Sequence, residues 1–169
     1  MDLLKANAEY YFFYIVDLLF ERNHIDKIVE HLYIGNIYTA LNKNVLKNNH
    51  IDVIINCSTD IPFIEDTTIT TYRFPLEDDK SDKYINIMTS SLEHYVNIIE
   101  KHIQNNENVL VHCRAGVQRS ASLVVAYIMK YLKLDLENAT LFVKNCRHCI
   151  FFPSMNFRKS LLHFEKTFK

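Results

Sequence analysis

Residues 111–120 read VHCRAGVQRS, and this stretch indicates both how the chain folds and what it binds. An apolar run, VLV at residues 109–111, precedes it, and a helix-like run, residues 123–131, follows it. The chain has two glycines, and Gly116 lies inside this stretch, where a backbone must turn with positive φ or approach a ligand closely. The pattern predicts a strand, a loop with inward-facing amides and a helix N-terminus, which together suit a tetrahedral oxyanion such as phosphate or sulfate.

The side chains of this loop suit nucleophilic chemistry on a bound phosphate. Cys113 is expected at the positive end of the helix, among amides and close to Arg119, and each of these favours thiolate over thiol. Arg119 offers a planar fork that can hold two phosphate oxygens and stabilise their charge in the transition state. Ser120 can donate a hydrogen bond to the Cys113 sulfur, which helps that sulfur depart when a phosphocysteine is hydrolysed. His112 is expected to orient the loop rather than to transfer protons, and a buried structural cysteine is the alternative interpretation.

The string HCRAGVQRSASLVVAYIM, residues 112–129, resembles the HCxxGxxRS signature of the dual-specificity branch of the cysteine-dependent protein phosphatases. The resemblance covers residues 25–168 and is carried by four further segments. HLYIGNIYTA (31–40) and IDVIINCST (51–59) are similar to early strands of the family. YRFPLEDD (72–79) is similar to its general-acid segment, and FFPSMNFRKSLLHFE (151–165) is similar to its last helix.

This resemblance implies hydrolysis of phosphotyrosine and of phosphoserine or phosphothreonine in proteins through a phosphocysteine, without metal or cofactor. Tyrosine-only relatives carry a longer domain with a loop that deepens the pocket, and this chain has no equivalent. The resemblance also implies a set of phosphate-binding loop residues: His112, Arg114, Ala115, Gly116, Val117 and Gln118.

The segment LEDD, residues 76–79, supplies candidates for the general acid. A leaving oxygen departs faster when it is protonated as it leaves, so such a site needs a carboxylic acid on a mobile loop. The family's acid-loop pattern matches Asp78 best, which would act first as acid and then as base. Asp79 and Asp82 remain alternatives, because the stretch between Asp78 and Cys113 is a few residues longer than is usual in the family.

Two positions depart from the family pattern. Gln118 stands where a serine or asparagine is common, although its amide can still form hydrogen bonds. Ser154 follows Pro153 where the family often has an asparagine that braces the phosphate loop, so either Ser154 or Asn156 is expected to take that part. Because the nucleophile, the arginine, the hydroxyl and an acid are all present, the sequence predicts an active enzyme.

The other three cysteines are interpreted separately. Cys57 ends the apolar run VIINC and resembles the backdoor cysteine that some relatives use to trap the oxidised nucleophile as a disulfide, with a buried strand cysteine as the alternative. Cys146 and Cys149 form a CxxC pair, but a structural zinc needs four ligands and no second pair exists, so they are expected to be thiols at a helix end. Four cysteines without a secretory signal indicate an intracellular, cytoplasmic protein. Abundant Ile and Asn with scarce Gly and Ala suggest an AT-rich genome, viral or protist, and a viral source would place the protein in the virion or the host cytoplasm.

Composition and charge limit the other functions. A net charge of −1 and a pI near 6.7, without a run of Lys or Arg, argue against strong binding to nucleic acid or to an anionic membrane. An RNA 5′-triphosphatase would need a basic groove, and phosphoinositide phosphatases often carry lysines in the loop, whereas this loop adds only Arg114 to Arg119. A phospho-binding module without catalysis is the alternative from a different class.

Hydrophobic patterning predicts a single α/β domain with a central, mostly parallel, twisted sheet of four or five strands and helices on both faces. Residues 51–57 and 109–112 are expected to be buried strands, with 28–34 and 70–74 as further strands. Helical spacing relates two sets of apolar residues, with Ser154 as the candidate N-cap of the second: Leu92, Val96, Ile99 and Ile103, then Phe157, Leu161, Phe164 and Phe168.

The segment 1–24 is expected to be a helical extension ahead of a catalytic domain at residues 25–169. Its residues 10–20 read YYFFYIVDLLF, apolar almost all round a helix but too short to span a bilayer. Such a helix needs to be covered, either by its own domain or by a second subunit. Of these alternatives we favour a homodimer formed through this segment.

Overall fold

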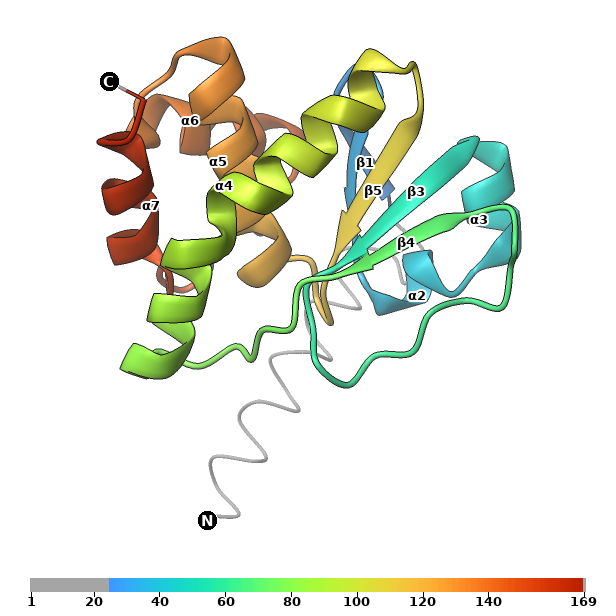
Figure 1. Ribbon diagram of the computed structural model, residues 1–169, viewed down its shortest axis with the longest axis horizontal. Helices are drawn as coiled ribbons and strands as arrows, with labels where there is room; N and C mark the ends of the chain where they lie inside the picture. The colour runs from blue at the N-terminus through green and yellow to red at the C-terminus, as the bar shows by residue number, and fades with distance from the viewer. Residues whose placement is uncertain (1–24, 169) are drawn as a thin grey trace.

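A five-stranded sheet forms the centre of the structure, a computed structural model that describes residues 25–168 (Figure 1). The strand order is β1-β2-β5-β3-β4, in which β1 pairs antiparallel with β2 and the other neighbours are parallel. The prediction of a mostly parallel sheet of four or five strands is therefore confirmed. The strands are β1 (Ile25–Val29), β2 (Leu32–Gly35), β3 (Ile51–Asn56), β4 (Thr70–Arg73) and β5 (Asn108–His112).

Helices cover both faces of this sheet, as the alternation of strands and helices predicts. Figure 1 shows α4 to α7 on one side and α2 with α3 on the other. The helices are α2 (Ile37–Ala40), α3 (Lys43–Asn48), α4 (Asp82–Gln104), α5 (Arg119–Leu132), α6 (Leu136–Cys146) and α7 (Arg158–Glu165).

The prediction of one strand over residues 28–34 is wrong, because the chain reverses inside that range. β1 ends at Val29 and β2 begins at Leu32, and the two pair as a hairpin. The turn is made by Glu30 and His31, and His31 has a φ of 62°. Neither residue is a typical turn former, so the sequence carries no local signal for the reversal. The turn is stabilised from outside, because the amide of Val109 donates to the His31 carbonyl at 2.8 Å.

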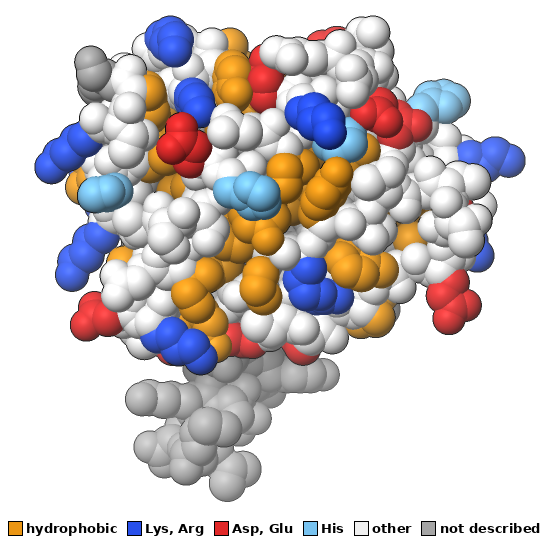
Figure 2. Space-filling model, in the orientation of Figure 1, with side chains coloured by type: hydrophobic (Ala, Val, Ile, Leu, Met, Phe, Trp, Pro, Cys, Tyr) orange, Lys and Arg blue, Asp and Glu red, His pale blue; other side chains and the backbone are white. Residues whose placement is uncertain are grey.

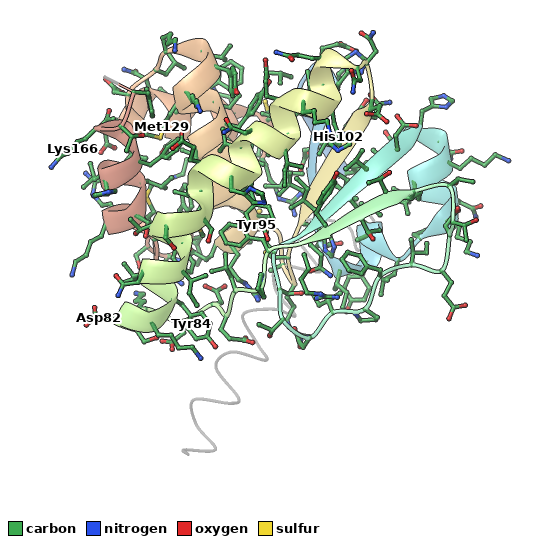
Figure 3. The ribbon with its side chains drawn as sticks, viewed as in Figure 1. Asp82, Tyr84, Tyr95, His102, Met129 and Lys166 are labelled. Carbon is green, nitrogen blue, oxygen red and sulfur yellow. The ribbon has the colours of Figure 1, made fainter. Side chains whose placement is uncertain are left out.

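The predicted apolar face of α4 is largely confirmed. Leu92, Val96 and Ile99 are fully buried in the main core, whereas Ile103 is only partly buried. The neighbouring His102 is buried instead. Its Nε2 lies 3.0 Å from the hydroxyl of Tyr72 on β4, which satisfies this polar group inside the fold. Figure 3 shows His102 on α4 near the sheet. This contact fastens the end of α4 to the edge of the sheet.

The last helix begins later than the sequence suggests. Ser154 is not its N-cap, because α7 begins at Arg158 and Phe157 occupies the N-cap position. The reason is tertiary: Gln118 bonds to the backbone of residues 152–156 and holds them as a turn. The predicted apolar set is buried as expected, although Phe157 precedes α7 and Phe168 follows it. Three of its residues are buried and the last is partly buried: Phe157, Leu161, Phe164 and Phe168.

Charges of both signs are mixed on the face that Figure 2 shows, with Lys and Arg side chains between Asp and Glu. Within residues 25–168, no helix combines the length and apolar character needed to cross a membrane. The predicted helical extension at residues 1–24 lies outside the described residues.

Candidate active site

The loop that follows β5 leaves the sheet at the edge where the parallel strands end. β5 lies between β2 and β3, so Gly35 and Asn56 at the ends of those strands flank His112 in register. The amide of Cys57, the next residue after β3, donates to the His112 carbonyl at 2.7 Å. Carboxyl ends of parallel strands are where open α/β sheets bind ligands.

Four successive carbonyls of this loop accept hydrogen bonds from groups outside it. The donors, in order from Arg114 to Val117, are the amide of Ile37 at 3.1 Å, Nη2 of Arg147 at 3.2 Å, Nε of Arg147 at 2.9 Å and the amide of Phe151 at 2.9 Å. A trans peptide group directs its N–H opposite its C=O, so the amides that follow these carbonyls turn into the loop. The Gly116 amide shows this directly, because it donates to the Cys113 sulfur at 3.2 Å. The predicted cradle of inward amides is therefore present.

The two glycines of the chain meet at this loop. Gly116 has a φ of 71°, as its place in the motif predicts, and a Cβ there would lie 2.5 Å from the carbonyl oxygen of Gly35. A side chain at Gly35 would in turn lie 2.9 Å from the Thr39 methyl group. Both positions thus require glycine, and the role of Gly35 is visible only once β2 lies beside the loop.

The Cys113 thiol is buried beneath the loop. Besides the Gly116 amide, the Ser120 hydroxyl donates to its sulfur at 3.3 Å. Burial by itself raises the pKa of Cys113, but the Arg119 guanidinium and the Ser120 hydrogen bond outweigh it and lower the pKa below its usual value. These contacts shift the Cys113 equilibrium toward thiolate, and the catalytic roles of Cys113, Arg119 and Ser120 stay predictions.

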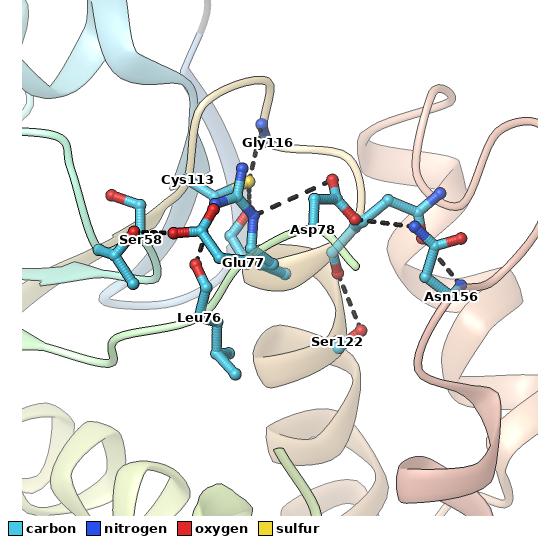
Figure 4. A network of polar contacts seen from close by, with 12 residues as sticks. Ser58, Leu76, Glu77, Asp78, Cys113, Gly116, Ser122 and Asn156 are labelled. Carbon is cyan, nitrogen blue, oxygen red and sulfur yellow. Dashed lines mark hydrogen bonds and ion pairs between the residues drawn. The ribbon is translucent and has the colours of Figure 1, made fainter. Parts of the chain in front are cut away.

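Arg119 begins α5 with its side chain buried. Its Nη1 donates to the Leu76 carbonyl at 3.1 Å, whereas its buried Nε has no hydrogen-bond partner among residues 25–168. The Nε atom lies 3.9 Å from Oδ2 of Asp78 (Figure 4). Buried donors are normally satisfied, so an unpaired one beside the Cys113 sulfur and the inward amides suits an oxyanion ligand.

Of the three candidate acids, Asp78 lies nearest to this centre. Figure 4 shows it between the Cys113 loop and Asn156, whose Nδ2 donates to Asp78 Oδ1 at 2.7 Å. Asp79 is exposed and accepts hydrogen bonds from Ser81, which lower its pKa and so favour the carboxylate over the protonated form that a general acid needs. Asp82 is exposed at the start of α4. The geometry therefore brings Asp78 to the site and leaves Asp79 and Asp82 outside it.

A side chain of Ser154 or Asn156 was expected to brace the phosphate loop, but the structure shows the opposite arrangement, in which a loop side chain bonds to the backbone of these two residues. Gln118, inside the loop, donates from Nε2 to the Ser154 carbonyl at 2.8 Å and accepts at Oε1 from the Asn156 amide at 3.1 Å. The side chain of Asn156 holds Asp78 instead, and the Ser154 hydroxyl contacts Lys80 at 3.3 Å. Gln118 is thus the hydrogen-bonding link between the phosphate loop and the turn before α7.

The remaining loop residues have structural contacts. Burial lowers the pKa of His112 to about 4, which keeps it neutral, and its Nδ1 lies 3.3 Å from the Cys113 carbonyl, which suits the orienting role. Arg114 is on the rim, where it pairs with Asp60. Two loop side chains pack together with a cysteine behind the loop: Ala115, Val117 and Cys149.

The cysteines other than Cys113 are all free thiols. Cys57 is buried at the end of β3, and burial together with the nearby Cys113 raises its pKa. Cys146 is the last residue of α6, as expected, whereas Cys149 lies beyond that helix. Within residues 25–168 there is no group of three or more His, Cys, Asp or Glu side chains placed to hold a metal ion.

Two residues that contribute to the site, Arg147 and Asp26, were not among those predicted from the sequence. Arg147 follows α6 with its side chain 2% exposed, and besides its two bonds to the loop it contacts Oδ2 of Asp26 on β1 at 2.5 Å. In the sequence Arg147 is one basic residue within NCRHC, and no spacing marks it.

The fold and the loop together define a class. A central parallel strand delivers a thiol into an anion-binding loop at a helix N-terminus, which is the architecture of the cysteine-dependent phosphatases. Within that class, the model of the "Dual specificity phosphatase, catalytic domain" family matches residues 32–167. The chain therefore belongs to the dual specificity phosphatase family.

Individual relatives agree with this assignment. The chain is 34% identical over 148 residues to mouse dual specificity protein phosphatase 8, covering 86% of this chain and 21% of that protein. It is 39% identical over 141 residues to "Putative tyrosine phosphatase 123R" of Invertebrate iridescent virus 6, covering 83% of this chain and 91% of the viral protein. The crystal structure of DUSP15 superposes with a TM-score of 0.76 at 29% identity, covering 85% of this chain and 88% of that one. The chain thus spans about a fifth of the mammalian phosphatase 8 and nearly all of the viral relative.

Proposed function

We propose that this chain is a dual-specificity protein phosphatase that hydrolyses phosphotyrosine, phosphoserine and phosphothreonine in proteins. The observation that carries the proposal is the buried Cys113 sulfur, which accepts hydrogen bonds from Ser120 and Gly116 beside the unpaired Nε of Arg119. The site groups that we assign to the chemistry come from the protein alone, and no metal or cofactor takes part. The relatives named dual specificity phosphatases support the same substrate class.

In the first step the Cys113 thiolate attacks the phosphorus of the substrate. The loop amides and the Arg119 guanidinium hold the phosphoryl oxygens and stabilise their charge as the S–P bond forms. The bond between phosphorus and the substrate oxygen breaks, and Asp78 in its acid form donates a proton to that oxygen. The dephosphorylated side chain leaves as a neutral hydroxyl, and Cys113 carries the phosphate.

In the second step a water molecule attacks the phosphocysteine. Asp78, now a carboxylate, takes a proton from the water as the new P–O bond forms. The S–P bond breaks, and the sulfur departs as a thiolate that the Ser120 hydroxyl stabilises, since that hydroxyl lies 3.3 Å away. Inorganic phosphate leaves, and the enzyme returns to its starting state.

The test is phosphate release from a peptide phosphorylated on both threonine and tyrosine, measured in EDTA. We expect the native protein to remove both phosphates and Cys113→Ser to remove neither. Cys146→Ser is the matched control, because that thiol lies at the end of α6, and it should behave as the native protein does. Release of the tyrosine phosphate alone would contradict dual specificity. Release from RNA 5′-triphosphates or phosphoinositides, with none from the peptide, would move the assignment to those substrates.

We also propose that the protein acts in the cytoplasm on phosphorylated proteins. A thiolate nucleophile requires a reducing compartment, and all four cysteines are free. Cytoplasmic staining of the tagged full chain in cells that express it would support this location, and an extracellular signal would contradict it.

A further inference from the structure

We propose that Arg147 is a positioning residue that sets the direction of the two peptide groups on either side of Gly116, and that Asp26 holds Arg147 in place. The proposal deepens the proposed function, because it concerns how the same loop acquires its affinity for a phosphoryl group. Its geometric basis, however, does not depend on turnover.

The two hydrogen bonds from Arg147 are placed on the two peptide groups that share Gly116. Nη2 binds the Ala115 carbonyl at 3.2 Å, and this carbonyl belongs to the peptide group that carries the Gly116 N–H. Nε binds the Gly116 carbonyl at 2.9 Å, and this carbonyl belongs to the peptide group that carries the Val117 N–H. Because each trans peptide is planar, fixing its carbonyl outward fixes its N–H inward.

These two peptide groups are the ones most in need of such a constraint. Gly116 must lack a side chain because of the close approach of Gly35, and it has a φ of 71°. A glycine backbone has little steric preference between alternative orientations, so the peptides beside it can rotate more readily than the others in the loop. A rotation would turn a carbonyl toward the Cys113 thiolate in place of an amide. Arg147 opposes that rotation on both sides of Gly116.

The contacts of Arg147 require the guanidinium group. Nε and Nη2 serve two different carbonyls while Nη1 contacts Oδ2 of Asp26 at 2.5 Å, a planar arrangement that lysine cannot reproduce. The side chains of both partners are largely buried, with 2% of Arg147 and 11% of Asp26 exposed. A buried cation needs a counter-charge, so Asp26 on β1 makes it possible to keep Arg147 under the loop. The hairpin strand β1 is thereby linked to the site.

The experiment measures the loop without requiring turnover. Arg147→Lys, Arg147→Met and Asp26→Asn are compared with the native protein, and Arg158→Met is the matched control, because Arg158 pairs with Glu137 on the surface. Two quantities are measured on full-length protein. One is the pH dependence of Cys113 alkylation by iodoacetamide, followed by peptide mapping, and the other is the concentration of inorganic vanadate that protects Cys113 from alkylation. Urea unfolding shows the conditions under which each variant is folded.

We expect both Arg147 variants to need at least tenfold more vanadate for protection and to show a higher Cys113 pKa. Asp26→Asn should show a smaller change of the same sign, and Arg158→Met none. A folded Arg147→Lys with native vanadate protection and a native Cys113 pKa would overturn the proposal and leave Arg147 a purely structural residue. If Arg147→Met does not fold, Arg147→Lys and Asp26→Asn decide the question. A native protein that binds vanadate but releases no phosphate would instead contradict the proposed function alone.

Discussion

At the scale of single residues, Asp78 and the neighbouring Asp79 differ in their expected role, because only Asp78 is placed to act as the general acid. It lies 3.9 Å from Arg119 Nε and is held by Asn156, whereas Asp79 accepts hydrogen bonds from Ser81. We expect Asp78→Asn to lower kcat on a phosphothreonine peptide by about 100-fold, because the leaving alkoxide is no longer protonated. On p-nitrophenyl phosphate, whose leaving group is more stable, the loss should be smaller. Steady-state kinetics on both substrates measures this, and an equal loss in Asp79→Asn would contradict the assignment.

Cys57 and Cys113 provide a second prediction for single residues. Both thiols are buried at the same edge of the sheet, and burial, with a further contribution from Cys113, raises the pKa of Cys57. We expect hydrogen peroxide to convert Cys113 to a sulfenic acid, which the Cys57 thiol then attacks with loss of water to form a disulfide. Peptide mapping before and after dithiothreitol should show this bond form and disappear, with recovery of activity. Mapping that finds only sulfinic or sulfonic Cys113, with no such bond, argues against it.

His112 should make the stability of the protein depend on pH. Burial lowers its pKa from 6.5 to about 4, so below pH 6.5 the unfolded state binds more protons than the folded state. Stability is therefore lost as the pH falls from 6.5 toward 4, by about 3 kcal/mol over that range. Urea unfolding at several pH values measures this. His112→Asn should remove that part of the pH dependence, and an unchanged slope in the variant would show that His112 is not its source.

At the scale of elements, the end of β2 is packed too closely against α2 and β5 for a side chain at Gly35. An added Cβ would lie 2.9 Å from the methyl group of Thr39 on α2. We expect Gly35→Ala to destabilise the fold by about 1–3 kcal/mol through this overpacking. Thr39→Ser removes that methyl group, so the double variant should recover part of the loss. Urea unfolding of the two single variants and the double variant tests this, and additive losses would indicate that the two residues do not compete for space.

The strands and helices could be predicted from the sequence wherever the hydrophobic pattern of neighbouring residues is enough to specify them. The strand before Cys113 and the helix after it confirm the reading of residues 109–131, because buried strands and helices leave strong periodic signals. The hairpin at Glu30 and His31 was missed, since that turn is stabilised by contacts with β5 rather than by turn residues. The start of α7 was misplaced, since Gln118 and not a local cap sets it.

At the scale of the whole molecule, one edge of the sheet assembles the site from segments far apart in the chain. The β2 end, the β3 end, the acid loop, the phosphate loop and the turn before α7 all contribute contacts there. β5 is central in the strand order, so its loop has neighbours on both sides. The loop therefore holds its conformation through contacts that come from both neighbouring strands and from distant turns.

The association of two chains is also a property of the whole molecule. We propose a homodimer formed through residues 1–24, which lie outside the described residues. We expect light scattering on the full chain at micromolar concentration to give the mass of a dimer, because residues 10–20 carry an almost wholly apolar sequence. Glutamate in place of Phe13 and Ile15 should reduce that mass to the monomer, about 20.0 kDa. A monomeric mass for the native chain would contradict the proposal.

The sequence by itself determined the nucleophile loop and the alternation of strands and helices. Cys113, Gly116, Arg119 and Ser120 are neighbours along the chain, so their approach follows from one short turn and its helix. The tertiary structure decided how other residues reach that loop, including Asp78 and Asn156, which the family resemblance had offered only among alternatives. The contacting residues are Gly35 from the hairpin, Asp78 from the acid loop, and Arg147 and Asn156 from the C-terminal turns, and Asp26 acts on the loop through Arg147. Such contacts are set by strand register and core packing between distant segments, and short-range residue patterns do not encode them.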